Sequence, residues 1–224
     1  MGTESIEASF LSIFALISFF VFLLVSKYAH KISDGVLFDK DFSKPQAFHD
    51  LPVTRSGGIA AIISLSIFFV IYQLLYAEVL YDYIFISYSV FLVGFLDDLK
   101  INIKPLTRLI IMIFLLLVSI FFLPIKILNI DIPFLSFLIS NHTFSSLFVL
   151  LCFLFVINGA NLIDGFNGLL TINLIIINII LTYINISNEN LELSFLIISQ
   201  IIILLSFLLF TIRCTQKFYT IIFL

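Results

Sequence analysis

The stretch "VGFLDDLKINIKPLTR", residues 93–108, places two adjacent carboxylates between two apolar segments. A mostly apolar run over residues 83–96 leads to Asp97 and Asp98, and a second run begins near residue 106, after a loop rich in lysine. Two neighbouring carboxylates repel each other unless a cation or a proton neutralises one of them. The stretch therefore predicts two apolar helices joined by a charged loop that needs a partner.

The composition of the whole chain extends this pattern to a membrane protein. Hydrophobic residues make up 62% of the 224 residues, charged residues only 11%, and the mean hydropathy is +1.23. These polar residues are too few to cover the core of a soluble domain. We predict an all-α, polytopic integral membrane helical bundle that forms a single transmembrane domain over residues 1–224. The net charge of −3 argues against a nucleic-acid partner, which would need a basic surface.

Apolar runs predict about seven transmembrane helices. They fall at residues 8–26, 58–76, 83–96, 106–123, 144–157, 169–186 and 193–212. The third and the fifth are shorter than the roughly 20 residues that a helix needs to cross the hydrocarbon core. We expect these two to be extended by their polar flanks, or to be tilted and buried in the bundle.

Basic residues predict the orientation in the membrane. With the N terminus outside, all but one of the 11 Lys and Arg residues fall on the cytoplasmic side, and only Lys126 lies outside. Cytoplasmic loops of membrane proteins carry such an excess of Lys and Arg. We expect a multi-pass protein of the cell's inner, cytoplasmic membrane.

A first polar motif, "LPVTRSGGIA" at residues 51–60, precedes the second apolar run. Arg55 supplies a permanent cation, and Ser56 and Gly57 can expose backbone N–H groups at a helix N terminus, where an anion binds favourably. The alternative is a basic membrane anchor followed by a glycine-flanked helix start.

The second motif is the Asp97–Asp98 pair itself. A divalent metal, or a base acting beside one, would resolve the repulsion between the two carboxylates. The alternative is a solvated helix end whose charges pair with Lys100 or Lys104. Negative charge at a helix C terminus opposes the helix dipole, which weakens that alternative.

The third motif is "NGANLIDGFNGLL", residues 158–170, with Asn158, Asn161, Asp164 and Asn167 at every third position. On a helical path this spacing places the four polar groups along one ridge, which must face a partner other than lipid. The alternative is a polar contact between helices. All three motifs fall on the predicted cytoplasmic side, and together they indicate a site for a metal-bound phosphate compound.

In this order and at these separations, the three motifs resemble those of the polyprenyl-phosphate N-acetylhexosamine-1-phosphate transferases. This glycosyltransferase family, family 4, includes the phospho-N-acetylmuramoyl-pentapeptide transferase of peptidoglycan synthesis, and the likeness runs from about residue 27 to 210. It implies transfer of a HexNAc-1-phosphate from a UDP-N-acetylhexosamine to undecaprenyl phosphate, a polyprenyl phosphate, with release of UMP. It also implies Mg²⁺, with Mn²⁺ as a substitute, a role in initiating cell-wall or surface polysaccharide synthesis, and membrane lipid and a second copy in a homodimer as partners.

The resemblance assigns a role to each motif residue. Catalytic roles fall to Asp97, Asp98 and Asp164, and metal binding to Asp97 and Asp164. Substrate binding falls to Arg55, Ser56, Gly57, Lys104, Asn158, Asn161 and Asn167. Which of Asp97 and Asp98 acts as the base stays open, as does the identity of the sugar.

The chain departs from the family's pattern in two places. Many relatives carry Asp where this chain has Asn167, and relatives continue beyond the last apolar run with a Gly-Asp metal-binding segment and a histidine-rich cytoplasmic loop. We therefore expect a C-terminally truncated member of the family, and whether the chain is active alone stays open.

Three other classes of membrane protein are alternatives to the transferase. A non-catalytic membrane scaffold or remnant stays open because of that expected truncation. A transporter is less favoured, because it would more naturally carry an ionisable residue near the middle of a span. An aspartate-rich prenyltransferase does not fit, because the third acid of its motif would fall at Ile101.

Overall fold

Apolar runs fold into helices here because lipid offers the backbone no hydrogen-bond partner, so each span must satisfy its own N–H and C=O groups. The computed structural model describes the backbone of residues 2–32, 38–39, 53–54, 56–98, 105–123, 127, 130–163 and 168–215. Side chains are described for residues 9–28, 56–95, 106–123, 127, 130–160, 162–163 and 168–211.

The described elements confirm the all-α fold class. The helices are α1 (Gly2–Ile32), α2 (Gly57–Tyr76), α3 (Tyr81–Asp98), α4 (Pro105–Phe122), α5 (Pro133–Ile139), α6 (His142–Ile163), α7 (Leu169–Ser187) and α8 (Leu191–Thr215). Two strands of two residues each, β1 (Phe38–Asp39) and β2 (Val53–Thr54), pair antiparallel between α1 and α2. The sequence did not predict this pair.

Several helices are long and apolar enough to cross a membrane, which confirms a polytopic membrane protein. Five qualify among the described residues: Ser9–Tyr28, Gly57–Tyr76, His142–Ala160, Leu169–Ser187 and Leu191–Thr211. The apolar parts of α3 and α4, Tyr81–Phe95 and Leu106–Phe122, are shorter. Each of the seven predicted runs coincides with a helix, while the seven-residue α5 was not predicted.

The two short predicted runs are extended by their polar flanks, as expected. The fifth run, predicted at 144–157, is part of α6, which continues through Asn158 and Asn161 to Ile163. The third run, predicted at 83–96, is part of α3, which includes Asp97 and Asp98 at its end. The polar motifs are thus the ends of these helices and not loops beside them.

The chain separates into two compact units. Unit 1 comprises Met1–Val79 and Ile163–Leu224, hence α1, α2, α7 and α8, and unit 2 comprises Leu80–Leu162, hence α3 to α6. Each unit is described by itself below. The single transmembrane domain therefore stays a prediction.

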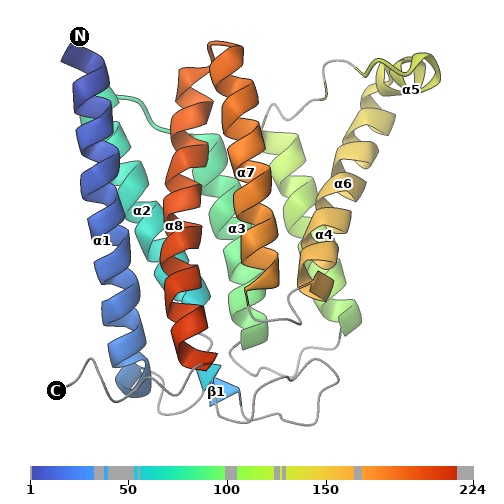
Figure 1. The fold of residues 1–224 in the computed structure, drawn as a ribbon. Coiled ribbons are helices and arrows are strands. Elements are labelled where there is room, and N and C mark those ends of the chain that lie inside the picture. The colour runs from blue at the N-terminus through green and yellow to red at the C-terminus, as the bar shows by residue number, and fades with distance from the viewer. Residues whose placement is uncertain are drawn as a thin grey trace, which may run out of the picture. The chain divides into compact units, whose positions relative to one another are not determined.

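In unit 1, α8 runs parallel to α1 and antiparallel to α2 and α7. Near the start of α1 the ring of Phe10 lies 5.3 Å from that of Phe195 in α8 and 5.8 Å from that of Phe68 in α2. Further along, the Ser18 hydroxyl donates to Ser206 Oγ at 3.2 Å, so α1 and α8 lie side by side over much of their length (Figure 1). Such buried small residues let helix backbones approach closely in a membrane.

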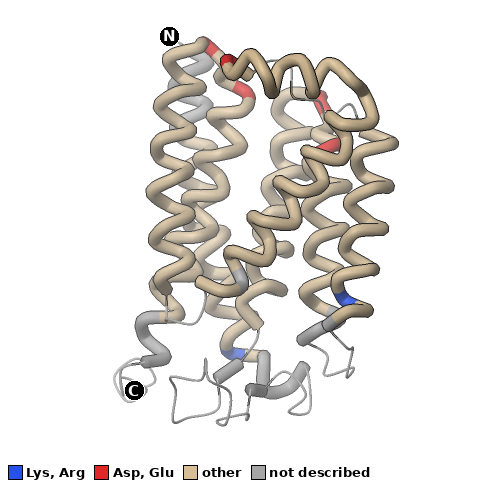
Figure 2. Tube along the Cα trace, turned by 90° about the vertical axis from the view of Figure 1, so that its right-hand side faces the viewer, with Lys and Arg blue, Asp and Glu red and all other residues tan. Residues whose placement is uncertain are grey.

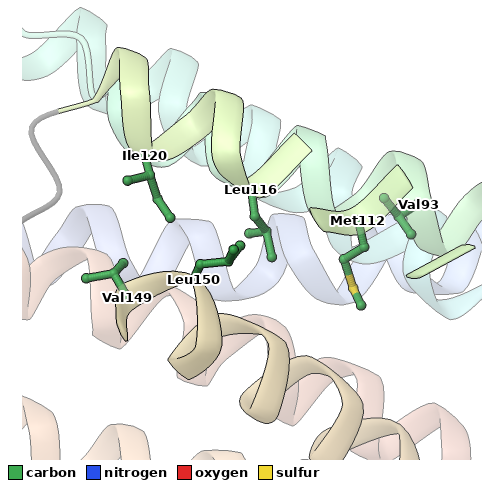
Figure 3. Close-up of a cluster of buried hydrophobic side chains, with 6 residues drawn as sticks. All are labelled: Val93, Met112, Leu116, Ile120, Val149 and Leu150. Atoms are coloured by element: carbon green, nitrogen blue, oxygen red, sulfur yellow. The ribbon is translucent and has the colours of Figure 1, made fainter. Parts of the chain in front are cut away.

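In unit 2, three residues of α4 form the centre of the hydrophobic core. Met112, Leu116 and Ile120 follow at intervals of four and therefore share one face of the helix. Figure 3 shows this face directed at Val149 and Leu150 of α6, with Val93 of α3 beside Met112. Because α4 and α6 run in opposite directions, Ile120 is level with Val149 while Met112 lies toward the end of α6.

Described charged side chains gather at the ends of the helices (Figure 2). Within each unit, the directions of the packed helices show which charged residues share an end. Among the residues with described side chains, unit 1 has Lys27 toward the end of α1 and Glu78, Glu189 and Glu192 at the opposite end, and unit 2 has Arg108 at the start of α4 with Asp82 and Asp131 at the opposite end. Within each unit, the described cation and the described acids are thus segregated.

Candidate functional site

The first motif ends in the first turn of α2. Ser56 is the N-cap residue, only 6% exposed, and its carbonyl accepts a hydrogen bond from Ala60 N–H at 3.1 Å. The Ser56 side chain makes no capping hydrogen bond to the first turn. The leading N–H groups of a helix have no acceptor within the helix, so the start of α2 offers donors to an anion.

Gly57 lies against α8. A methyl group placed on Gly57 would come 2.5 Å from Cε2 of Phe207, closer than carbon atoms approach in proteins. Position 57 therefore accepts no side chain while Phe207 keeps its place.

The third motif ends in the first turn of α7, in the same unit. Gly168 is the N-cap residue of α7, with a φ of +80° that L residues rarely adopt. A methyl group on Gly168 would come 2.9 Å from Cδ1 of Leu208. Because Phe207 and Leu208 are consecutive in α8, unit 1 brings the ends of the first and third motifs to the same level of that helix.

In unit 2, the core places the second motif at one end of the helices. Val93 lies one helical turn before Asp97, and Met112 lies one turn after Arg108. Since Val93 and Met112 pack together, the backbone at Asp97 and Asp98 lies at the end of unit 2 where half-buried Arg108 follows the start of α4. Arg108 was not among the predicted site residues, although it closes the quoted stretch.

Asn158 lies at this same end of unit 2. Its neighbour Ile157 packs against the core, and the Asn158 Nδ2 group donates to the Leu154 carbonyl at 2.7 Å. Asn173 and Asn185 of α7 donate in the same way to carbonyls four residues earlier. This hydrogen bond is thus common to asparagines in these helices and does not indicate a function for Asn158. Its assignment to the site depends on its position near the end of α6.

The structure does not describe the side chains of the remaining predicted site residues. Arg55, Lys104, Asp164 and Asn167 lie outside the described residues, and for Asp97, Asp98 and Asn161 only the helical backbone is described. Among the residues with described side chains, no group of three His, Cys, Asp or Glu residues could hold a metal ion. That set leaves out Asp97, Asp98 and Asp164, so the metal site stays a prediction.

No sequence pattern indicated a role for Phe207 or Leu208. Both lie in a long apolar helix, where phenylalanine and leucine are ordinary residues facing lipid or a neighbour. Only the packing of α8 shows that they touch the starts of α2 and α7.

The fold and the motifs define a polytopic membrane protein whose polar motifs, where they are described, reach the ends of its helices. Glycosyl transferase family 4 matches residues 80–219, more than half of the chain, and the protein belongs to this family. Membership confirms the resemblance and makes the protein a membrane transferase of the sugar-phosphate kind. No curated protein and no solved structure matches the chain.

The matched region includes the second and third motifs but begins after the first. Asp97, Asp98 and the segment from Asn158 to Asn167 fall within residues 80–219, while Arg55, Ser56 and Gly57 precede them. The roles of these three residues depend on the local geometry at the start of α2.

Proposed function

We propose that this protein transfers a HexNAc-1-phosphate from a UDP-N-acetylhexosamine to a polyprenyl phosphate such as undecaprenyl phosphate, at the cytoplasmic face of the inner membrane. The observation that carries the proposal is the family match, which spans both the Asp97–Asp98 pair and the Asn158–Asn167 segment. In the structure, the described parts of these motifs are helix ends, where a protein can meet a lipid phosphate at the membrane surface.

The charge distribution supports the orientation. Lys27 in unit 1 and Arg108 in unit 2 lie at the same helix ends as the polar motifs of their units, and the described acids lie opposite. Cytoplasmic ends of membrane helices carry the excess of basic residues. We infer that the N terminus is outside and that the motif ends face the cytoplasm, where UDP-sugars are present.

The reaction requires charge neutralisation and alignment more than covalent chemistry by the protein. An oxygen of the lipid phosphate forms a bond to the phosphorus that carries the sugar, and the bond from that phosphorus to the UMP oxygen breaks. In our proposal Asp97 or Asp98 holds the proton of the lipid phosphate and orients its attacking oxygen. Arg55 and the first-turn N–H groups of α2 bind the phosphates of the nucleotide.

The donor set fits a hard divalent cation. Asp97 and Asp164 offer carboxylate oxygens, which Mg²⁺ prefers as ligands and Mn²⁺ also accepts. Bound there, the ion would neutralise charge on the diphosphate. The Asn161 and Asn167 amides are proposed to bind the nucleotide-sugar beside it.

The test measures UMP release and the lipid-linked product formed by the chain in lipid nanodiscs containing polyprenyl phosphate. We expect turnover with a UDP-N-acetylhexosamine and Mg²⁺, and none after EDTA until Mg²⁺ is restored. Asp98→Asn should lower the rate about 10²-fold or more, the usual contribution of a group that moves a proton. Asp82→Asn is the matched control, because Asp82 lies at the other end of the same helix.

Two results would contradict the proposal. One is a folded wild-type chain that releases no UMP with any UDP-N-acetylhexosamine, which would favour a non-catalytic scaffold. The other is an equal rate for Asp98→Asn and Asp82→Asn.

A further inference from the structure

Two consecutive residues of α8 contact the starts of two different helices. Phe207 meets Gly57 at the start of α2, and Leu208 meets Gly168 at the start of α7. The side chains of successive residues in a helix point about 100° apart, so two consecutive residues of α8 can face two different neighbouring helices. Each contacted glycine directly adjoins a motif residue, Ser56 on one side and Asn167 on the other.

Phe207 also contacts an aromatic ring of α1. Its ring makes an edge contact with Phe22 of α1, with 6.2 Å between ring centroids. Phe22 is buried and also stacks on Phe210 of α8, at 6.2 Å. Because closely packed rings have little room to move, a displacement of Phe207 would be passed on to Gly57.

We propose that Phe207 and Leu208 are positioning residues of the transferase site, which set the distance between the start of α2 and the start of α7. This inference rests on the proposed function. Through Gly57, Phe207 fixes the N–H groups that bind the nucleotide phosphates. Through Gly168, Leu208 fixes the point at which the Asn158–Asn167 segment joins α7.

The physical reason is the precision that phosphate recognition needs. Donors bind an anion well only over a narrow range of distances, and a displacement of about 1 Å in a site can lower activity by two orders of magnitude. Glycine at positions 57 and 168 lets α8 approach both helix starts without a side chain between them. In this arrangement α8 supports the site without touching substrate.

The test compares Phe207→Leu with Phe210→Leu. Both lie in α8 and both contact Phe22, but Phe207 is the ring that meets Gly57. We expect Phe207→Leu to raise KM for the UDP-sugar about tenfold, because the binding turn loses its support. Phe210→Leu should leave KM unchanged while lowering thermal stability to a similar extent.

A second variant pair tests the contact itself. Gly57→Ala should lower turnover in the wild-type background, because its methyl group displaces the Phe207 ring. In the Phe207→Leu background, where Cε2 and Cζ are removed, the same change should cost much less. Such non-additivity is typical of residues in contact and is not expected for distant, independent sites.

The outcomes separate the two proposals. A wild-type chain without turnover refutes the proposed function and this inference with it. An active wild-type chain in which Phe207→Leu and Phe210→Leu have equal KM values, or in which the effects of Gly57→Ala and Phe207→Leu add, overturns the positioning role alone.

Discussion

Replacement of Gly168 with alanine is expected to destabilise the protein by about 2 kcal/mol, from two separate costs. An L residue in a left-handed conformation such as the φ of +80° at Gly168 costs about 1–2 kcal/mol. The added methyl group, 2.9 Å from Leu208 Cδ1, also forces the end of a flexible side chain to shift. A displaced rotamer of this kind costs about 0.5–1.5 kcal/mol.

The matched control is Gly159→Ala in the same motif. Gly159 lies inside α6, and a methyl group there would meet no heavy atom within 4 Å. Alanine is favoured over glycine in a helix by roughly 0.5–1 kcal/mol, so this variant should be neutral or stabilised. Gly168→Ala should therefore lower the free energy of unfolding, and Gly159→Ala should not lower it.

The assay is unfolding in mixed micelles titrated with a denaturing detergent, followed by circular dichroism. Gly168→Asn separates the two costs, because asparagine tolerates the left-handed conformation while keeping the clash. In a Leu208→Ala background, Gly168→Ala should still carry the conformational cost but no longer the steric cost, because Leu208 Cδ1 is absent. Equal shifts for Gly168→Ala and Gly159→Ala would refute the reasoning.

Two further predictions concern the cores of the two units. In unit 2, the Leu116 side chain is 3% exposed, and Leu116→Ala should lower the stability by about 2–4 kcal/mol. Phe121 on the same helix is 81% exposed, so Phe121→Ala should cost little. Equal losses in the same detergent titration would contradict the assigned core. Ser206→Ala should destabilise unit 1 more than Ser18→Ala, because it leaves the fully buried Ser18 hydroxyl without its acceptor. In Ser18→Ala, Ser206 keeps its hydrogen bond to the Ile202 carbonyl. A larger loss of stability in Ser18→Ala would refute this view of the bond.

Sequence reasoning predicted the helices well and two smaller elements not at all. Each apolar run coincides with a helix, and the extension of α6 through Asn158 is one of the two alternatives that the shortness of its run predicted. Helix α5 was missed because seven residues are too few to show a helical period. The β1–β2 pair was missed because two-residue strands carry no pattern of their own.

The candidate site was predicted in its chemistry and only partly in its geometry. The family match confirms the class to which the motifs point. The backbone of Asn161 is helical, as the three-residue spacing suggested, and the backbone of Asp97 and Asp98 ends α3. The roles of individual site residues and the metal stay predictions. Arg108 was present in the quoted stretch, but its place at the same end of unit 2 as the backbone of Asp97 and Asp98 follows only from the core, in which Val93 and Met112 pack together.

The amino-acid sequence by itself determined that the chain forms membrane helices and that its polar motifs lie at their ends. The reason is that hydrocarbon excludes unsatisfied backbone and charged groups, and this constraint acts on each segment separately. Only the tertiary structure decided that Phe207 and Leu208 meet Gly57 and Gly168. Lipid and neighbouring helices are equally apolar, so an apolar helix such as α8 does not record in its sequence which face will meet which partner.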